Sequence, residues 1–434
     1  MATQTKQKVG ITSPGLVFPF IAITTLYFAF GFITNLNQGM VPELKQIFEV
    51  HQLATWEAMM ANFAFFLAYF VFSTPSAWLI EKIGYKRTMI VSLLVQVVGA
   101  LLFLPAAQMV SFPLFLTGIF VVGAGVTGLQ TSANPYAASL GPDESAPARL
   151  TLAQAFNSVG ATLAPWVVGN FILTSTFLDP VVVAQQNPAQ QHAYQMSIAN
   201  TVRTPYIIVA VALAILAVAV AFAHLPHIKA EESKDSAGGN AERSIWTFKH
   251  TVLAAVSIFF YVGVEVGLAT TMVLYFSDST HGGLNVMTVA SAQKIVALYW
   301  GGALVGRLLG PWMMSLMKPG HLLGVFGGCA SALVVTAMFV PGYAAVGALL
   351  LAGFFNSVMF PTIFALGIAG LGPLTSRGSG IITTAIVGGA IVPVAFGWLV
   401  DHASYQVALI LAVFCYMFIA YYGVLGSKPT QTVV

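Results

Sequence analysis

Charged residues are scarce in this chain: Asp, Glu, Lys and Arg make up 7% of its 434 residues. A soluble domain carries roughly 25% charged residues, so the deficit excludes an ordinary water-soluble fold. Cysteine is nearly absent as well, because only Cys329 and Cys415 occur, both within apolar runs. Neither predicts a disulfide, a metal site or redox chemistry. We therefore expect no catalytic residues, no metal, no cofactor and no nucleic-acid partner.

Hydrophobic residues are abundant instead, at 58% of the chain, which indicates an all-α integral membrane protein in a lipid bilayer. Twelve apolar runs near or above 18 residues are long enough to cross a bilayer as helices. They lie near residues 17–39, 57–80, 88–108, 112–138, 149–175, 204–224, 250–276, 292–315, 320–341, 343–370, 377–400 and 405–426. The N-terminal residues lack the apolar core and cleavage site of a signal peptide, so the first run is expected to remain in the mature protein.

Basic residues are distributed unequally between the two sides of the predicted membrane protein. If both termini lie on one side, that side holds 14 of the 17 Lys and Arg residues. The other side holds Lys45, Arg203 and Lys294. Lys and Arg accumulate in cytoplasmic loops, so both termini are predicted to be cytoplasmic.

The polar stretch 227–249 separates six spans from six spans, which predicts an N-terminal half, 1–226, a cytoplasmic linker and a C-terminal half, 250–434. Pro135, Arg149, Pro165 and Gly169 in the first half correspond to Pro361, Arg377, Pro393 and Gly397 in the second. The interval from Arg to Pro is 16 residues in both halves, and that from Pro to Gly is 4. Helix punctuation by Pro and Gly is common, so chance is the alternative, but duplication is favoured. Two similar six-helix halves are typical of an alternating-access transporter.

Longer phrases occur from the first span to the eleventh. They are LNQGMVPELK, IEKIGYKR, QTSANPYAASLGP and RLTLAQAFNSVGATLAP in the first half, and FFYVGVEVG, GRLLG, NSVMFPTIFALGIAGLGP and AIVGGAIVPVAFGWLVD in the second. On these phrases the chain resembles the major facilitator superfamily and, within it, the fucose–galactose–glucose–proton symporter family. FYVGVEVG is most similar to the bacterial glucose/galactose transporter branch. The resemblance implies two pseudo-symmetric six-helix halves in a bacterial inner membrane, and we also expect a monomer.

The chain departs from the fucose-permease branch at two positions that carry acids there. It has Gln38 in the first span and Gln130 in the fourth, where the acids are associated with substrate binding and proton coupling. Glutamine donates and accepts hydrogen bonds but does not titrate. Sugar binding through these two residues is therefore expected, and proton coupling through them is not.

Pairs of amides three or four residues apart lie on one face of a helix in three predicted spans. The pairs are Asn35 and Gln38, Gln130 and Asn134, and Gln154 and Asn157. Amides can hold sugar hydroxyls by bidentate hydrogen bonds, so we expect these faces to line a binding cavity. The alternative is bonding between neighbouring helices, worth about 0.6 kcal/mol each. Asn134 precedes Pro135 and has a third possible role, satisfying the carbonyls that a proline frees.

Glu265 is the acid that lies well inside a predicted span. A carboxylate at that depth costs a few kcal/mol unless it faces water, has a partner or takes up a proton. Tyr261, one turn earlier, is its expected hydrogen-bond partner. Glu265 is the candidate for sugar binding and for coupling to H⁺ or Na⁺, and a purely structural interhelical bond is the alternative. Asn356, in the phrase NSVMFPT, is a further candidate for substrate binding.

Charged residues near the predicted cytoplasmic ends of spans are candidates for a gate: Glu81, Lys86, Arg87, Arg149, Arg307 and Arg377. Four of them belong to the gating-loop signature after the second and eighth spans, and Arg149 and Arg377 occupy matching positions in the two halves. We expect them to hold the inner face closed when the transporter opens outward. Anchoring at the cytoplasmic surface is the alternative.

The candidate function is secondary active import of a hexose or related small sugar together with a cation, with H⁺ favoured over Na⁺. An uncoupled facilitator, or a symporter for a disaccharide or an amino sugar, is the alternative. An intramembrane enzyme needs titratable groups clustered at one depth, and none of the eight histidines lies deep in a predicted span. A channel needs polar faces along full spans, and the sequence does not show them.

Overall fold

The computed structural model describes residues 12–13, 15–39, 55–167, 185–226, 244–279 and 281–429. In chain order the main helices are α1 (Val17–Gly39), α3 (Thr55–Ile83), α4 (Tyr85–Gln108), α5 (Phe112–Ala138), α6 (Ala146–Val167), α8 (Pro188–Phe222), α9 (Lys249–Ser277), α10 (Val289–Leu316), α11 (Pro319–Phe339), α12 (Gly342–Asn356), α13 (Met359–Ile368), α14 (Thr375–Thr384), α15 (Gly388–His402) and α16 (Tyr405–Tyr421). Short 3₁₀ turns η2 (Asp143–Ser145), η4 (Ile245–Thr247), η5 (Gly372–Leu374) and η6 (Ala385–Val387) lie between helices, and a π-helical turn η7 (Tyr422–Gly426) extends α16.

Ten segments of the described chain are long and apolar enough to cross a membrane, judged by length and composition. Helices α12 and α13 count together as one of them, and so do α14 and α15. Helices α6 and α10 occupy the positions of the other two predicted spans, near 149–175 and 292–315. Both carry polar side chains, among them Asn157 and Arg307, that line a cavity between the helices. Each predicted span therefore has a helical counterpart, although residues 168–175 lie outside the described part.

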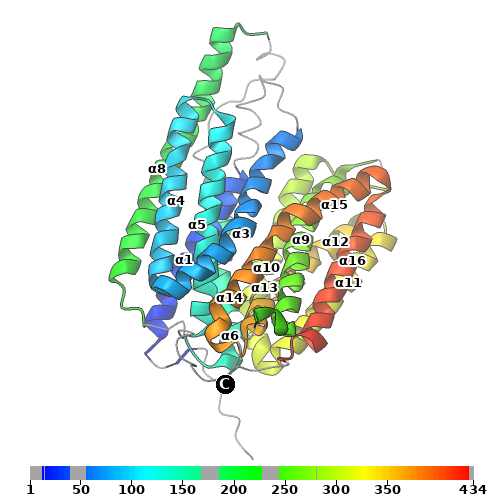
Figure 1. The fold of residues 1–434 in the computed structure, drawn as a ribbon. Coiled ribbons are helices and arrows are strands. Elements are labelled where there is room, and N and C mark those ends of the chain that lie inside the picture. The colour runs from blue at the N-terminus through cyan, green and yellow to red at the C-terminus, as the bar shows by residue number, and fades with distance from the viewer. Residues whose placement is uncertain are drawn as a thin grey trace, which may run out of the picture.

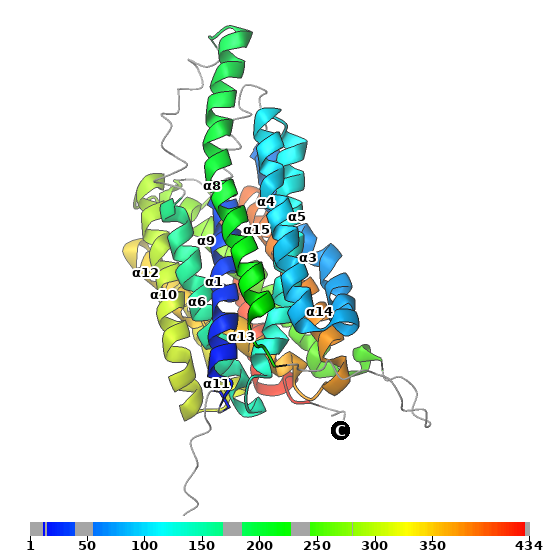
Figure 2. The same ribbon diagram turned by 90° about the vertical axis from the view of Figure 1, so that its left-hand side faces the viewer.

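The helices form two groups that lie side by side (Figure 1). In the first group α4 packs on α5 and α8, and α1 packs on α6; in the second α9 packs on α15, and α11 on α12 and α16. The view in Figure 2 shows α8 on the outside of the first group, in front of α1. The groups meet where α3 contacts α14 and where α6 contacts α10. The predicted division at 227–249 stays a prediction, since residues 227–243 lie outside the described ranges.

Helices α1 and α6 approach closely because glycine occupies both sides of their crossing. A Cβ on Gly31 would collide with the backbone and amide of Asn157, and one on Gly160 would collide with the carbonyl of Phe28. Small residues permit such backbone contact between membrane helices, whose association depends on close packing. The crossing places Asn157 directly beside α1, with its Nδ2 donating to the Tyr27 carbonyl at 3.3 Å.

Candidate functional site

A cavity of about 470 Å³ lies at the centre of the molecule, between the two groups of helices. Its polar lining comprises Thr34, Asn35, Gln130, Gln154, Asn157, Ser158, Thr162, Tyr261, Glu265 and Arg307, and its aromatic lining Phe30, Phe66, Trp300 and Phe360. Helices α1, α5 and α6 contribute the amides, whereas α9 and α10 contribute the charged residues. The volume and the mixed lining suit a small, hydroxyl-rich molecule.

Four of the amides predicted from the sequence meet in this cavity: Asn35, Gln130, Gln154 and Asn157. Three of them are held by hydrogen bonds that use their N–H groups. Gln130 donates to the hydroxyl of Tyr69 at 2.9 Å, Asn35 donates to the Gly31 carbonyl at 3.0 Å, and Asn157 donates to the Tyr27 carbonyl at 3.3 Å. Since these bonds fix the amide planes, the carbonyl oxygens are pre-positioned as acceptors for a ligand.

Asn134 lies outside the cavity lining. The hydroxyl of Tyr27 donates to its Oδ1 at 2.6 Å, so the residue joins α5 to α1. It does not satisfy the carbonyl that Pro135 deprives of a helical donor, which belongs to Thr131 four residues earlier. Ser379 of α14 donates to that carbonyl at 2.7 Å, from the other group of helices. The side chain of Gln38 lies outside the described residues, although its backbone continues α1.

Glu265 lies in the cavity wall with 13% of its side chain exposed. The hydroxyl of Tyr261 donates to its Oε1 at 2.6 Å, as the helical spacing predicted. Arg307 of α10 approaches the same oxygen, with Nη2 at 3.7 Å. The buried acid thus has one hydrogen-bond donor and one positive charge as partners, which offset part of the cost of its desolvation.

Arg307 was expected to act in the gate with the loop charges after the eighth span, although it falls inside the predicted span 292–315. Helix α10 carries it, and its side chain lies in the cavity wall. Its Nε donates at 3.4 Å to the carbonyl of Ser357, which lacks a helical donor because Pro361 stands four residues later. Arg307 lies about as far into its predicted span as Glu265 does, so the depth criterion applied to Glu265 would have identified it.

Asn356 lies behind the cavity lining and is fully buried. Its Nδ2 donates to the Tyr299 hydroxyl, and its carbonyl accepts from Tyr261 at 3.2 Å. Tyr299 in turn donates to the Glu265 carbonyl at 3.4 Å. Asn356 therefore supports the helices that carry Glu265 and Tyr261, and contact with a ligand in the cavity is not expected of it.

Trp300 is the aromatic residue best placed to stack on a ligand, since it lines the central cavity and is 42% exposed. Two other aromatic residues of the spans, Phe28 and Tyr275, lie elsewhere. Tyr275 lies against Tyr405, and its hydroxyl donates to the Ala337 carbonyl. It is not part of the cavity lining. Phe28 lines a different cavity, between α1 and α8.

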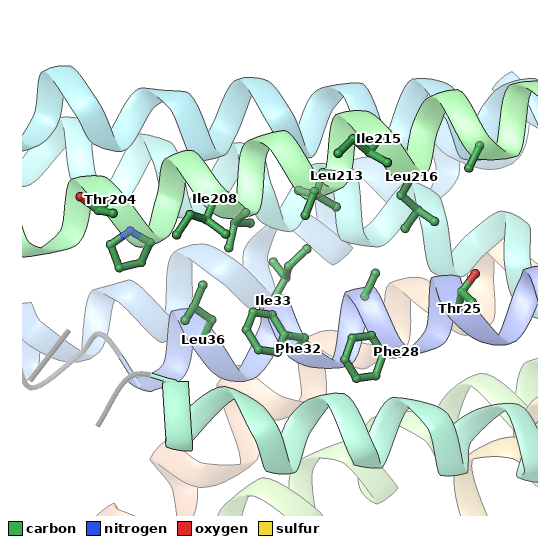
Figure 3. Close-up of a pocket in the computed structure, with 15 residues that line it drawn as sticks. Thr25, Phe28, Phe32, Ile33, Leu36, Thr204, Ile208, Leu213, Ile215 and Leu216 are labelled. Carbon is green, nitrogen blue, oxygen red and sulfur yellow. The ribbon is translucent and has the colours of Figure 1, made fainter. Parts of the chain in front are cut away.

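That second cavity measures about 670 Å³ and is larger than the central one. Figure 3 shows its walls, with Phe28, Phe32 and Leu36 on α1 and Ile208, Leu213 and Leu216 on α8. Thr25 and Thr204 contribute its side-chain hydroxyls, and Ile208 is 62% exposed. Both helices qualify as membrane spans, so this groove is a surface suited to lipid chains and offers too few polar groups for a sugar.

Glu81 and Arg377 form an ion pair between α3 and α14, with Nε and Oε1 at 2.9 Å. The pair connects the two groups of helices at the end where α3 ends and α14 begins, and both views show these helices together (Figures 1 and 2). Arg87 is exposed on α4, and Lys86 donates to the carbonyls of Ala221 and Ala223 at the end of α8. Two of the predicted gate residues therefore meet each other.

Arg149 does not repeat the arrangement of Arg377, although the two occupy matching sequence positions. Its side chain is fully buried within the first group of helices. The guanidinium donates to the carbonyls of Ala137, Ala138, Gly141 and Pro142 and to the hydroxyl of Ser145. These bonds provide donors to carbonyls at and just after the end of α5, where helical donors are lacking. They also fix the turn into α6.

Comparison with known proteins agrees with this architecture. Residues 23–387 match the family model described as Major Facilitator Superfamily. The Brucella abortus glucose/galactose transporter is 41% identical over 411 residues, which cover 95% of this chain and 94% of that protein. The Escherichia coli L-fucose-proton symporter is 32% identical over 396 residues, covering 90% of this chain and 89% of that protein.

Among solved structures, the transporter FucP in the outward conformation superposes with a TM-score of 0.85 at 30% identity, covering 95% of this chain and 99% of that one. The chain belongs to the major facilitator superfamily and, within it, to the fucose–galactose–glucose–proton symporter family, as its motifs predicted. The predicted fold class is confirmed, and the protein is a multi-pass membrane transporter rather than an enzyme.

Proposed function

We propose that this protein is a secondary active transporter that imports a hexose or a related small sugar together with a cation. The observation that carries the proposal is the central cavity, where amides from three helices face a carboxylate and an arginine from two others. A sugar needs many bidentate hydrogen-bonding groups and one apolar face to stack on, and Trp300 supplies the latter. The names of the relatives, glucose/galactose transporter and L-fucose-proton symporter, support the same substrate class.

The proposed substrate-binding residues are those in the cavity wall: Asn35, Gln130, Gln154, Asn157 and Glu265. Gln38 is also proposed to bind the substrate, because of its position in α1. Asn134 and Asn356 are proposed to act only by holding helices together, because their side chains bond to tyrosines outside the lining.

Glu265 is proposed to carry the coupling ion, with H⁺ favoured over Na⁺. The support is its position: an acid facing the cavity, shielded from bulk water and held by Tyr261 and Arg307. Protonation removes a buried charge and so provides a state in which the carrier can reorient. One observation favours an uncoupled facilitator instead, namely that Gln38 and Gln130 stand where the fucose-permease branch has acids.

We further propose that the structure represents an outward-facing state in a bacterial inner membrane, with both termini cytoplasmic and a single chain as the working unit. The distribution of basic residues supports the orientation. The Glu81–Arg377 pair then lies on the cytoplasmic side, where it closes the inner face. The similarity to a transporter solved in the outward conformation supports the same assignment.

The deciding experiment is uptake of radiolabelled D-glucose and D-galactose into vesicles that contain the purified protein. We expect saturable counterflow, and accumulation against a gradient when the outside is made acidic. Glu265→Gln should abolish accumulation and retain counterflow, whereas the matched Glu265→Asp variant should keep both to a measurable degree. Accumulation by Glu265→Gln would rule out Glu265 as the carrier, and uptake that requires sodium at fixed pH would rule out proton coupling. Absence of counterflow with every common hexose would overturn the substrate class.

A further inference from the structure

Arg307 contacts three separate parts of the molecule at once. Its Nη2 faces the Glu265 carboxylate of α9, and its Nε donates to the Ser357 carbonyl at the break between α12 and α13. Its Nη1 donates to the hydroxyl of Ser158, which belongs to α6 in the other group of helices. Arg307 therefore joins the proposed coupling residue to the interface between the two groups.

The interface continues beyond this bond. Thr151, about two helical turns before Ser158 on α6 and fully buried, packs against Gly310 of α10. A guanidinium in a cavity wall needs acceptors, and a carboxylate is its strongest one. When Glu265 is ionised, the pair holds the guanidinium where Nη1 reaches Ser158. When Glu265 takes up a proton, Arg307 loses its counter-charge at this place and its orientation is no longer fixed.

We propose that Arg307 is a positioning residue that transmits the charge of Glu265 to the α6–α10 contact, closing it when Glu265 is ionised and releasing it when Glu265 is protonated. This rests on the proposed function, because the release must coincide with reorientation of a loaded carrier. It assigns Ser158 a role as the partner across the interface. Proton binding at the cavity then loosens the contact that the rocking motion has to break.

The titratable and charged groups that face Glu265 come from three helices. They are Tyr261 on α9, Tyr299 and Arg307 on α10 and Tyr416 on α16. The tyrosines remain neutral across the pH range used below. A pH response of the α6–α10 contact is therefore assigned to the Glu265–Arg307 pair.

The test measures how readily the interface opens. Thr151→Cys places a reporter thiol in it, in the full chain with Cys329 and Cys415 replaced by Ala. Alkylation by N-ethylmaleimide is followed between pH 5 and 8, and each rate is divided by that of the denatured protein at the same pH. We expect alkylation about tenfold faster at pH 5 than at pH 8, the change that accompanies loss of a charge-assisted hydrogen bond.

Variants separate this role from a general structural one. Ser158→Ala keeps the Glu265–Arg307 pair and should give fast, pH-independent alkylation, and Glu265→Gln should do the same. Thr162→Ala is the matched control, since Thr162 lines the cavity on the same helix and bonds only to the Ser158 carbonyl among the bonds described. The rate of alkylation in this variant should depend on pH as it does in the parent.

Slow, pH-dependent alkylation in Ser158→Ala would overturn the proposal, as would a pH response that persists in Glu265→Gln. Sugar counterflow and accumulation are measured on the same preparations. Proton-driven accumulation without a pH response of the thiol would refute the link while the proposed function stands. A pH response without transport of any hexose would refute the function while the link stands.

Discussion

Arg149 and Arg377 occupy matching positions in the two halves, yet we predict that the same substitution has different consequences at each. Arg149→Gln removes a fully buried guanidinium that donates to four carbonyls and one hydroxyl around the turn from α5 to α6. Arg377→Gln removes a guanidinium whose side chain is 46% exposed and which pairs with Glu81. The first change destabilises the folded structure of one group of helices. The second weakens the contact between the two groups.

The expected magnitudes follow from burial. Breaking a buried charged network costs about 3–5 kcal/mol, because carbonyls are left without donors. Glutamine is too short and too poor in donors to replace five bonds. An exposed ion pair contributes about 0.2–1 kcal/mol. At roughly 2 °C per kcal/mol for a large chain, Arg149→Gln should melt about 6–10 °C lower and Arg377→Gln within about 2 °C of the parent.

Thermal unfolding in detergent, followed by tryptophan fluorescence, measures both variants under one condition. Arg377→Gln should instead change transport, with counterflow altered up to about fivefold as the inner contact weakens. Glu81→Gln should match it, and the double variant should add nothing further if the two side chains act as a pair. Equal losses of melting temperature in Arg149→Gln and Arg377→Gln would refute the reasoning, as would a stable Arg149→Gln protein with a transport defect alone.

Three further predictions concern the cavity and its supports. Tyr261→Phe removes the donor 2.6 Å from Glu265 and should lower uphill accumulation about tenfold while counterflow remains, as measured in vesicles. Asn134→Ala should lower the free energy of unfolding by about 1–3 kcal/mol without changing the half-saturating sugar concentration, because its partner is a tyrosine of α1; a binding defect would contradict this. Gly160→Ala should push α1 and α6 apart and cost about 1–3 kcal/mol with weaker sugar binding, whereas Gly397→Ala, with open space at its Cβ, should do neither.

Much of the site was predictable because helical periodicity is a local property. Four of the amides identified by spacing line the cavity, and the partner of Glu265 was predicted from a separation of four residues. Spacing does not reveal which helix lies opposite a given face. Asn134 shares a helical face with Gln130, yet its side chain bonds to α1 because that helix crosses close to it.

The sequence by itself determined that this is a helical membrane protein, where its spans lie and which residues provide hydrogen-bonding groups at mid-membrane depth, because hydropathy and periodicity act along the chain. Only the tertiary structure decided how those groups are paired. Equivalent arginines acquired different partners, Arg149 within one group of helices and Arg377 between groups. Arg307 became part of the cavity because α9 and α10 bring it to Glu265, 42 positions away in the chain. Charge pairing in a bilayer depends on which helices are neighbours, and neighbours are chosen by packing across the whole molecule.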